Sequence, residues 1–509
     1  MLRSRLPSRL LAGVTLAALA LRVQAATPCE RLADVAPKGA RITSAQMVAA
    51  GQFAPPTGGG PPDARAIYAK LPAFCRVAAT LQPSADSEIR IEVWLPETWN
   101  GKLVEAGNGG YSPNLAFGGM AQAVLAGYAA TSSNTGHDGN SGAFAVGHPE
   151  KLIDWAYRAV HENAVAAKAI VQARYGSAPR QSYFEGCSTG GRQAYGEAQR
   201  YPADFIGIVA GDPGINLTHQ TAMQTWVSKV VHRGPDTAIP ASKYPLLHDA
   251  ALAACDARDG VRDGVIENPL QCRFDPSVLL CKGGDAPDCL TAPQLQTAKD
   301  IYRGAYDSNG KRVFPGLMPG SELGWNSLGG PEPMGYALDS YKYIVMQNPE
   351  WDYRTLDLDR DVARADAAYA DLLNNASPDI RPFFARGGKL LGYHGAADPG
   401  ITPLQSIDYY QSVAKVAGGV NALSNSYRLF LVPGMLHCGG GDGTNTFDMI
   451  AALDAWVTGN KAPDSIPAAR IRDGKVDRTR PLCPYPQQAV YKGSGSTDEA
   501  ANFSCAVKP

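Results

Sequence analysis

The chain has 509 residues, of which 45% are hydrophobic and 19% are charged, and its formal net charge is -1. This composition is that of a globular protein and excludes a disordered or fibrous chain. A net charge so close to zero gives no basic surface field, which argues against a nucleic-acid-binding protein. The length allows one large domain with an insertion, or two or three smaller domains.

The first 25 residues have the pattern of a secretory signal peptide. Arg3, Arg5 and Arg9 supply the positive start, residues 10–21 form an apolar run, and a Val-Gln-Ala sequence ends at Ala25. The apolar run is shorter than the roughly 20 residues that a membrane-spanning helix needs. We therefore expect a secreted protein, periplasmic or extracellular, without a membrane span.

The next segment, residues 26–66, is rich in proline and glycine, and we expect it to be irregular. Alternating apolar and polar residues predict a strand over 89–95. A second strand is expected at 102–106, and a Gly-Asn-Gly-Gly sequence follows it. Apolar residues at helical spacing predict a helix over 154–175, with Gly176 as its stop.

The rest of the chain alternates predicted strands with helices, apart from one long interruption. A helix is expected at 192–200, and strands are expected at 182–185, 207–210, 389–393 and 427–432. Residues 216–375 instead carry four of the ten cysteines, many aspartates and long loops. The pattern predicts an α/β core, residues 26–215 and 376–509, that is interrupted by an inserted domain, residues 216–375.

The strongest motif is a Gly-x-Ser-x-Gly sequence centred on Ser188. It lies between a predicted strand and a predicted helix, as the nucleophile elbow of an α/β-hydrolase does. Gly186 and Gly190 suit this turn because a side chain there would clash with neighbouring backbone. An ordinary serine in a glycine-rich loop is the alternative, which the flanking strand and helix disfavour. We therefore predict that Ser188 is a nucleophile.

A serine nucleophile needs a base, and the base needs an orienting acid. In an α/β-hydrolase the acid and then the base follow the serine along the chain. His437, in a glycine-rich loop after the last predicted strand, is the expected base. Asp398, in the loop after the preceding strand, is the expected acid. His394 is the alternative base, and Asp408 and Asp442 are alternative acids that we expect to be surface or helix residues.

The oxyanion of an acyl-transfer reaction needs backbone N–H donors that are already in place. One is expected from Thr189, the residue after the nucleophile. The other is expected from the glycine-rich turn after an early strand, where Gly110 is the candidate.

The cysteines point to disulfides, because their number is even and the expected compartment is oxidising. Short spacings suggest three local bridges, with other connectivities left open: Cys255–Cys272, Cys281–Cys289 and Cys483–Cys505. Cys187 precedes the serine and Cys438 follows the histidine. If those two catalytic side chains touch, their cysteine neighbours come within bridging distance.

Together these residues resemble the tannase and feruloyl esterase family, which joins a Cys-Ser pair, an Asp and a His-Cys pair. Cys187-Ser188, Asp398 and His437-Cys438 match that pattern, in which the two cysteines are bridged beside the triad. Residues 183–193, 198–202 and 433–440 also look similar to the family. The resemblance covers nearly all of the mature chain. Relatives include tannases, feruloyl esterases and the hydrolase of mono(2-hydroxyethyl) terephthalate.

The resemblance implies an α/β-hydrolase core with a lid inserted at residues 216–375. It implies a secreted serine hydrolase that forms an acyl-enzyme with small esters of aromatic acids, free or attached to plant polysaccharide. Feruloyl and other hydroxycinnamoyl esters suit it best, and gallate esters come next. The resemblance also adds a bridge between Cys29 and Cys75. A peptidase and an inactive calcium-stabilised binding protein are the alternative classes.

Five aromatic residues of the inserted domain are candidates for the acid pocket, although such residues more often belong to a core. They are Trp325, Tyr336, Tyr341, Tyr343 and Trp351. The terephthalate hydrolase type holds its substrate's free carboxylate with a lid arginine. This stretch has Lys342 but no arginine, which argues against a specialised terephthalate monoester hydrolase.

A short loop of the inserted domain carries three acids, Asp256, Asp259 and Asp263. Carboxylates this close repel one another unless a cation neutralises them, and Ca²⁺ takes carboxylate and backbone carbonyl oxygens as ligands. Two Asp-Gly turns with solvated acids are the alternative. The resemblance implies a structural Ca²⁺ that these three side chains hold with the carbonyls of Val261 and Val265.

Overall fold

A computed structural model describes residues 26–35, 37–56 and 66–508, so the expected signal peptide lies outside the described residues. Within them a nine-stranded sheet has the order β1-β2-β3-β5-β4-β6-β7-β10-β11. The strands are β1 (Ala40–Val48), β2 (Phe74–Leu81), β3 (Ile89–Pro96), β4 (Lys102–Ala106), β5 (Ala129–Ser133), β6 (Gln181–Cys187), β7 (Gly207–Gly211), β10 (Lys389–Gly395) and β11 (Tyr427–Val432).

The sheet is antiparallel from β1 to β5 and parallel from β5 through β4, β6, β7 and β10 to β11. Parallel neighbours need crossover connections, and helices supply them here. Side chains of α2 (Phe117–Leu125) and α15 (Met449–Gly459) pack in one core cluster with the sheet. Those of α5 (Thr189–Arg200) and α13 (Pro403–Ala417) pack in another, and α4 (Ala159–Tyr175) contributes to that cluster as well. The sheet is therefore covered on both faces.

The strands expected at 89–95, 102–106, 182–185, 207–210, 389–393 and 427–432 are all present. The expectation that residues 26–66 are irregular is wrong, because β1 lies there and pairs with β2. Its residues are exposed or only half-buried. This edge strand therefore lacks the buried apolar face that produces the alternating pattern by which a strand is recognised in the sequence. The helix expected from residue 154 starts earlier, as α3 (Pro149–Ile153), and passes through a π-helical turn, Asp154–Arg158, into α4.

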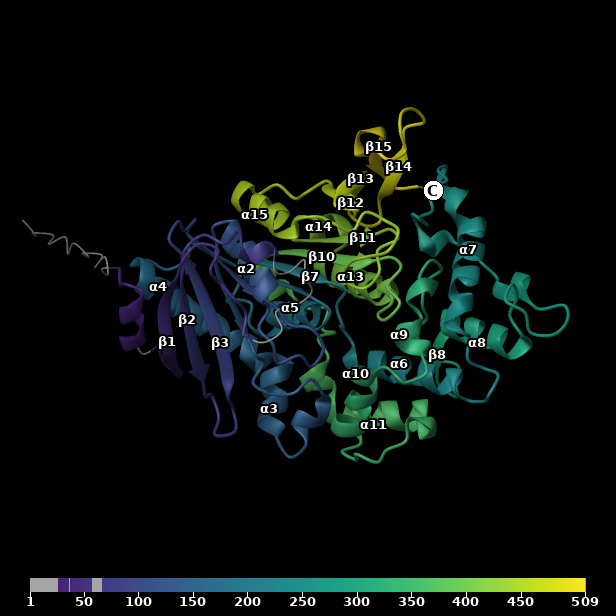
Figure 1. Ribbon diagram of the computed structural model, residues 1–509, viewed down its shortest axis with the longest axis horizontal. Helices are drawn as coiled ribbons and strands as arrows, with labels where there is room; N and C mark the ends of the chain where they lie inside the picture. The colour runs from purple at the N-terminus through teal and green to yellow at the C-terminus, as the bar shows by residue number, and fades with distance from the viewer. Residues whose placement is uncertain (1–25, 36, 57–65, 509) are drawn as a thin grey trace, which may run out of the picture.

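The chain between β7 and β10 forms a largely helical insertion (Figure 1). It contains α6 (Leu217–Val231), α7 (Tyr244–Cys255), α8 (Ala292–Arg303), the pair β8 (Gly304–Tyr306) and β9 (Arg312–Pro315), α9 (Asn326–Gly329), α10 (Gly335–Asp339) and α11 (Leu358–Leu373). A core cluster of its own includes Met223, Leu247 and Trp325. In Figure 1 the insertion lies at the opposite end of the molecule from β1, β2 and β3.

Two hairpins end the chain and lie near α7 in Figure 1. They are β12 (Ile466–Arg472) with β13 (Lys475–Leu482), and β14 (Gln488–Tyr491) with β15 (Phe503–Ala506). In the described part of the chain, no helix has both the length and the apolar character to cross a membrane.

All ten cysteines lie in the described residues, and all are bridged. The pairs are Cys29–Cys75, Cys187–Cys438, Cys255–Cys272, Cys281–Cys289 and Cys483–Cys505. These are the three bridges that the short spacings suggest, the one beside the catalytic residues, and the one that the family resemblance adds.

Candidate active site

Ser188 occupies the sharp turn between β6 and α5. Its backbone has φ 64°, a left-handed conformation that is uncommon for a residue with a side chain. A Cβ atom at Gly186 would lie 2.6 Å from the Cα atom of Gly190, and one at Gly190 would lie 3.1 Å from the carbonyl oxygen of Asn108, so a side chain is excluded at Gly186 and would be tight at Gly190. The geometry therefore explains the glycines of the motif and sets the serine hydroxyl at the start of a helix.

Ser188, His437 and Asp398 form one continuous hydrogen-bonded chain. The Ser188 hydroxyl lies 2.9 Å from Nε2 of His437, and Nδ1 of His437 lies 2.6 Å from Oδ2 of Asp398. Asp398 is fully buried, and its Oδ1 accepts the backbone N–H groups of Gly400 and Ile401, both at 2.8 Å. The acid is thus held in place, and it orients the imidazole toward the serine.

Electrostatics inside this group separate the pKa values of the base and the acid. Burial of His437 opposes its charged form, but the carboxylate of Asp398 outweighs burial and raises the pKa of His437 to about 9. Burial likewise opposes the charge on Asp398, but His437 and His394 lower its pKa well below the usual range. Asp398 is therefore the charged acid that stabilises a protonated His437.

This arrangement predicts the pH dependence of the reaction. Because the base must be neutral to accept the serine proton, kcat/KM for ester hydrolysis is expected to rise with pH, with its acid-limb midpoint above 6.5, the ordinary pKa of histidine. Asp398→Asn removes the charge that favours the imidazolium, so its residual activity is expected to have a lower midpoint. Rate profiles between pH 5 and 10 check this, and a wild-type midpoint at or below 6.5 contradicts it.

The alternative base and acids have contacts other than with Ser188, and His394 also lies 3.4 Å from Asp398. His394 is buried, with Nδ1 2.7 Å from the Ser406 hydroxyl and Nε2 2.7 Å from the Ile401 carbonyl oxygen. Asp408 forms a surface ion pair with Arg312 at 2.8 Å. Asp442 lies 3.4 Å from His248. The serine therefore meets His437, as the sequence predicts.

The bridge between Cys187 and Cys438 joins the residues beside Ser188 and His437. Their Cα atoms are 6.0 Å apart although 251 positions separate them in sequence. Cys438 has φ 61° and Ser188 has φ 64°. A residue with left-handed backbone therefore lies at the serine itself and directly after the histidine. The bridge fixes β6 to the loop after β11 at the point where the two side chains meet.

A pocket of about 290 Å³ opens onto this site. Its lining comes from the core and the insertion: Gly110, Ser188, Thr189, Arg192, Gly214, Gln220, Gln224, Ser327, Met334, Tyr336, Pro399, Gly400, Ile401 and His437. Both candidate oxyanion donors, Gly110 and Thr189, are in this set. Gly110 has φ 51°, and its carbonyl oxygen accepts the indole N–H of Trp155 at 3.2 Å.

Of the five aromatic candidates, Tyr336 lines the pocket. Trp325 and Tyr341 are buried in core clusters of the insertion, and Trp351 packs against the second of these. Tyr343 lies next to the Lys342 ammonium group, at 5.7 Å. Composition alone does not separate a pocket aromatic from a core aromatic, because both are apolar and half-buried or buried.

Several polar residues of the pocket were not predicted from the sequence. Gln220 and Gln224 lie one turn apart on α6 and are almost fully buried. Among the described residues, the Oε1 atoms of both have no hydrogen-bond partner, whereas Nε2 of Gln224 donates to Gly400 at 2.9 Å. Buried Arg192 donates to the carbonyls of Trp155, Ala156 and Leu373. The four-residue spacing of the two glutamines on α6 is the sequence signal that places them on the same face of that helix.

The acidic loop of the insertion brings its three carboxylates near one another. Asp256 accepts the N–H groups of Asp263 and Gly264 at 3.2 and 3.1 Å, and Asp259 accepts the N–H of Val261 at 2.8 Å. Burial raises the pKa of Asp259 to about 6, and the charges of Asp263 and Asp256 add to this effect. Carboxylate oxygens of this kind are ligands that Ca²⁺ takes.

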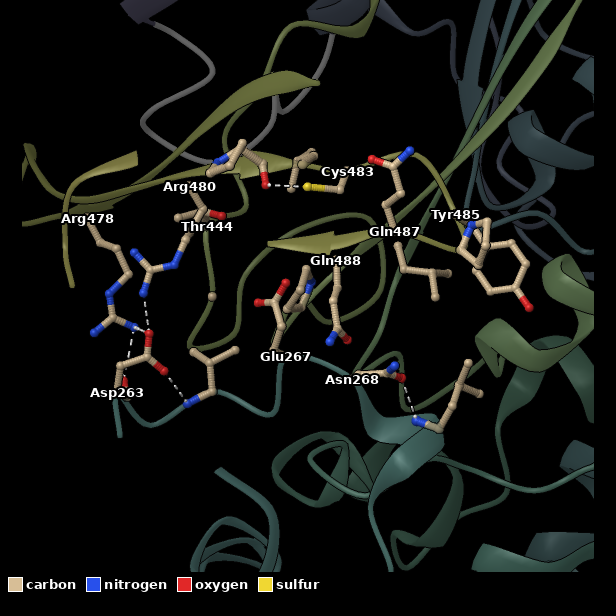
Figure 2. A pocket seen from close by; sticks show the side chains of 18 residues that line it. Asp263, Glu267, Asn268, Thr444, Arg478, Arg480, Cys483, Tyr485, Gln487 and Gln488 are labelled. Carbon is tan, nitrogen blue, oxygen red and sulfur yellow. Dashed lines mark hydrogen bonds and ion pairs between the residues drawn. The ribbon is translucent and has the colours of Figure 1, made fainter. Parts of the chain in front are cut away.

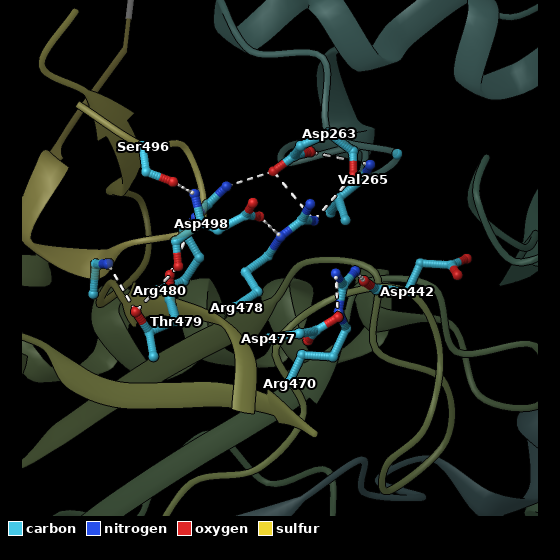
Figure 3. A network of polar contacts seen from close by, with 12 residues as sticks. Asp263, Val265, Asp442, Arg470, Asp477, Arg478, Thr479, Arg480, Ser496 and Asp498 are labelled. Carbon is cyan, nitrogen blue, oxygen red and sulfur yellow. Dashed lines mark hydrogen bonds and ion pairs between the residues drawn. The ribbon is translucent and has the colours of Figure 1, made fainter. Parts of the chain in front are cut away.

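Arginines of β13 reach Asp263 from the C-terminal hairpin (Figure 3). Oδ2 of Asp263 lies 2.5 Å from Arg480 and 3.4 Å from Arg478. Among the residues described, one oxygen from each of the three acids does not come within 4.8 Å of the other two. The oxygen donors are of the kind that Ca²⁺ takes, whereas the two arginines partly balance the negative charge of the loop and the three carboxylates do not form a closed coordination shell.

Behind this loop is a cavity of about 50 Å³, which Figure 2 shows with Glu267 and Gln488 side by side. Burial raises the pKa of Glu267 to about 8, and its Oε1 accepts the N–H of Ala489 at 2.9 Å. This volume is enough to hold water, because about 10–15 Å³ of such space suffices for one molecule. This cavity is separate from the serine pocket and lies between the insertion and the C-terminal hairpins.

Comparison with known proteins identifies the family of this chain. The family described as "Tannase and feruloyl esterase" matches residues 75–506. An uncharacterised esterase of Xanthomonas campestris is 36% identical over 97% of this chain and 93% of its own length. A probable feruloyl esterase B-2 of Aspergillus terreus is 35% identical over 85% of this chain and 86% of its own.

Solved structures agree on the architecture. Feruloyl esterase B from Aspergillus oryzae superposes with a TM-score of 0.88 and 32% identity, covering 94% of this chain and 99% of that one. Tannin acyl hydrolase from Aspergillus niger has the same fold, with a TM-score of 0.78, 24% identity and 92% coverage of each chain. The predicted α/β-hydrolase fold is confirmed. The chain belongs to the tannase and feruloyl esterase family and is a carboxylic ester hydrolase.

Proposed function

We propose that this protein hydrolyses esters of aromatic acids by an acyl-enzyme mechanism, with Ser188 as nucleophile, His437 as base and Asp398 as orienting acid. The observation that carries the proposal is the hydrogen-bonded chain of 2.9 and 2.6 Å that ends at the mouth of a 290 Å³ pocket. The three groups have the order and roles of a serine hydrolase triad.

In the first half of the reaction, Nε2 of His437 takes the Ser188 proton while Oγ forms a bond to the ester carbonyl carbon. The tetrahedral intermediate then expels the alcohol oxygen, which receives that proton from His437. In the second half, His437 activates a water molecule in the same way, and the acid leaves as Ser188 regains its proton. Asp398 stays ionised throughout and stabilises the imidazolium.

The oxyanion of each intermediate is assigned to the backbone N–H groups of Thr189 and Gly110. Thr189 begins α5, where the first N–H groups have no partner within the helix and the helix dipole favours negative charge. Gly110 shares the pocket with Ser188. Backbone donors of this kind are preorganised, so they need no rearrangement as charge develops.

The pocket favours an aromatic acyl group that bears hydroxyl groups. Met334, Ile401 and Tyr336 contribute apolar or aromatic surface, whereas Gln220 and Gln224 contribute amide groups. A phenolic hydroxyl both donates and accepts, so it can pair with an unpartnered amide. Relatives named feruloyl esterase support hydroxycinnamate esters as the first choice. Gallate esters are the second choice, because the two glutamine amides can form hydrogen bonds with more than one ring hydroxyl.

A substrate panel tests this assignment. We expect kcat/KM to be highest for methyl ferulate, followed by methyl gallate, and lowest for a terephthalate monoester. Gln220→Leu is expected to lower kcat/KM for methyl coumarate about 5- to 10-fold, since a hydrogen bond is worth roughly 1 kcal/mol. Methyl cinnamate, which lacks the hydroxyl, is the matched control and is expected to change little. Equal losses on both esters, or preference for the terephthalate, contradict the assignment.

We also propose that Asp256, Asp259 and Asp263, with the carbonyls of Val261 and Val265, hold one structural Ca²⁺. The loop lies on the insertion, apart from the serine pocket, so the ion supplies charge neutralisation to the fold. Burial, with a further contribution from the charges of Asp263 and Asp256, raises the pKa of Asp259, and a cation would oppose both effects. The bridge Cys255–Cys272 holds the start of the loop, which reduces the entropy lost when an ion binds.

Calcium removal is expected to lower the melting temperature, because an ion that binds the folded form stabilises it by about 2.7 kcal/mol at 100 times Kd. Asp259→Ala is expected to melt like the chelated wild type and to ignore added Ca²⁺. Asp249→Ala, an exposed acid of the same helical segment, is the control and is expected to keep the calcium response. Identical wild-type melting with Ca²⁺ and with EGTA, and no ion by metal analysis, contradict the site.

Secretion is proposed as well, with substrates that are free esters or esters on plant polysaccharide. Five disulfides among the described residues support an oxidising compartment. N-terminal sequencing of protein from the periplasm or medium is expected to begin at Ala26, and an intact Met1 contradicts cleavage.

A further inference from the structure

A second carboxyl group lies beside the triad and has no part in the mechanism above. Asp212 directly follows β7, the strand next to β10 in the sheet, and Asp398 follows β10. Because the two strands are parallel, both acids lie at the same edge of the sheet. Asp212 is fully buried, and its backbone has φ 37°, an unusual value for a residue with a side chain.

The contacts of Asp212 join it to the catalytic group. One oxygen from each of Asp212 and Asp398 and a ring nitrogen of His437 all lie within 4.8 Å of one another. Oδ1 of Asp212 accepts the N–H of Gly395 at 2.8 Å and lies 3.7 Å from Nε2 of His394. His394 is also 3.4 Å from Oδ2 of Asp398. Two buried acids and two imidazoles therefore share one cluster.

The charges in this cluster are coupled. Burial raises the pKa of Asp212 to about 7; His394 and His437 oppose that rise, and the negative charge of Asp398 adds to it. The Tyr393 phenol is also close enough to feel the charge of Asp212. Burial raises the pKa of Tyr393, and the charge of Asp212 adds to that rise. Loss of the Asp398 charge would remove a repulsion from Asp212 and favour its ionised form.

A purely structural role does not require a carboxylate at this position. Asparagine has the same size, tolerates a left-handed backbone and presents an oxygen that can accept the N–H of Gly395. What asparagine lacks is the ability to carry negative charge beside an imidazolium. The chain thus has an ionisable carboxyl group at position 212, where the amide of asparagine could make the same backbone hydrogen bond.

We propose that Asp212 is a second positioning acid for His437, which orients the ring and stabilises the imidazolium together with Asp398 and supports catalysis when Asp398 is absent. The proposal rests on the triad mechanism given above. The serine proton still moves to Nε2 of His437, and Asp212 does not accept it. The role of Asp212 is electrostatic, so it is a positioning residue and does not touch the substrate.

The test compares kcat/KM on one aromatic ester for Asp398→Ala, Asp212→Asn and the double variant Asp212→Asn/Asp398→Ala. Asp398→Ala is expected to retain on the order of tenfold more activity than the double variant, because the Asp212 carboxylate still favours the imidazolium of His437 in the single variant and is absent from the double variant. Asp408→Asn/Asp398→Ala removes an exposed acid instead and is expected to match Asp398→Ala. Melting curves of all variants confirm that the fold persists.

A pH profile separates the electrostatic role from a structural one. In the Asp398→Ala background, the acid-limb midpoint is expected to fall when Asp212→Asn is added, since His437 then loses its remaining neighbouring carboxylate. Equal activities and equal midpoints for Asp398→Ala and the double variant overturn the proposal. If Ser188→Ala keeps full activity, the triad mechanism itself fails, so the two failures are distinguishable.

Discussion

Ser188→Ala is expected to reduce kcat for aromatic ester hydrolysis to below about 1% of the wild-type value, since loss of the serine in a triad enzyme costs on the order of 10⁶-fold. In the proposed mechanism the hydroxyl is the group that bonds to the ester carbon, and the alanine variant lacks the oxygen that lies 2.9 Å from Nε2 of His437. The residual rate would come from the pocket and the oxyanion donors alone. Steady-state kinetics with methyl ferulate measures the effect.

The substitution is not expected to disturb the fold, because it removes one oxygen atom and leaves the glycines of the turn unchanged. Ser412→Ala is the matched control, since that hydroxyl lies on an exposed part of α13 and donates to a carbonyl of its own helix. It is expected to keep wild-type kinetics. A Ser188→Ala protein that folds normally and retains more than about 1% of kcat contradicts the assigned nucleophile.

Removal of the Cys187–Cys438 bridge is expected to lower both stability and activity more than removal of Cys483–Cys505. The two bridges span 251 and 22 positions, which correspond to about 5 and about 3 kcal/mol of loop-closure free energy at 25 °C. The first bridge also adjoins both ends of the serine–histidine contact, so its loss loosens that contact.

Double Cys→Ser variants of each bridge, compared by thermal melting and by kcat, measure the two effects separately. We expect kcat to fall strongly for Cys187→Ser/Cys438→Ser and to remain near wild type for Cys483→Ser/Cys505→Ser. Equal kcat for the two variants at a temperature where both are folded means that the bridge has no special role at the site.

Local sequence predicted the contact of Ser188, His437 and Asp398, because each residue has a short-range signal. The Gly-x-Ser-x-Gly turn, the strand before Asp398 and the loop that holds His437 are all recognisable within about ten residues, and the chain order of the α/β-hydrolase connects them. The bridge between Cys187 and Cys438 was predicted from the expected contact between Ser188 and His437. The central strands were also found, because they are buried and apolar.

Features that depend on partners far along the chain were not predicted. β1 is an edge strand with little buried surface, so its pairing with β2 leaves no apolar pattern. Asp212 stands beside His437 only because β7 and β10 are neighbours in the sheet. Arg480 reaches Asp263 across 217 positions. Such contacts are set by tertiary packing, which local patterns do not contain.

The central claim is that Ser188 is the residue that becomes acylated. Its most direct test is peptide mapping by mass spectrometry after inactivation with a serine-directed phosphonate, whose phosphorus bonds to the serine oxygen, releases its leaving group and forms an adduct that does not turn over. We expect one phosphonate per molecule, on the peptide that contains Ser188, with activity lost in proportion to labelling. Full ester hydrolysis by protein whose Ser188 is completely labelled, or inactivation with the label on another residue, contradicts the account.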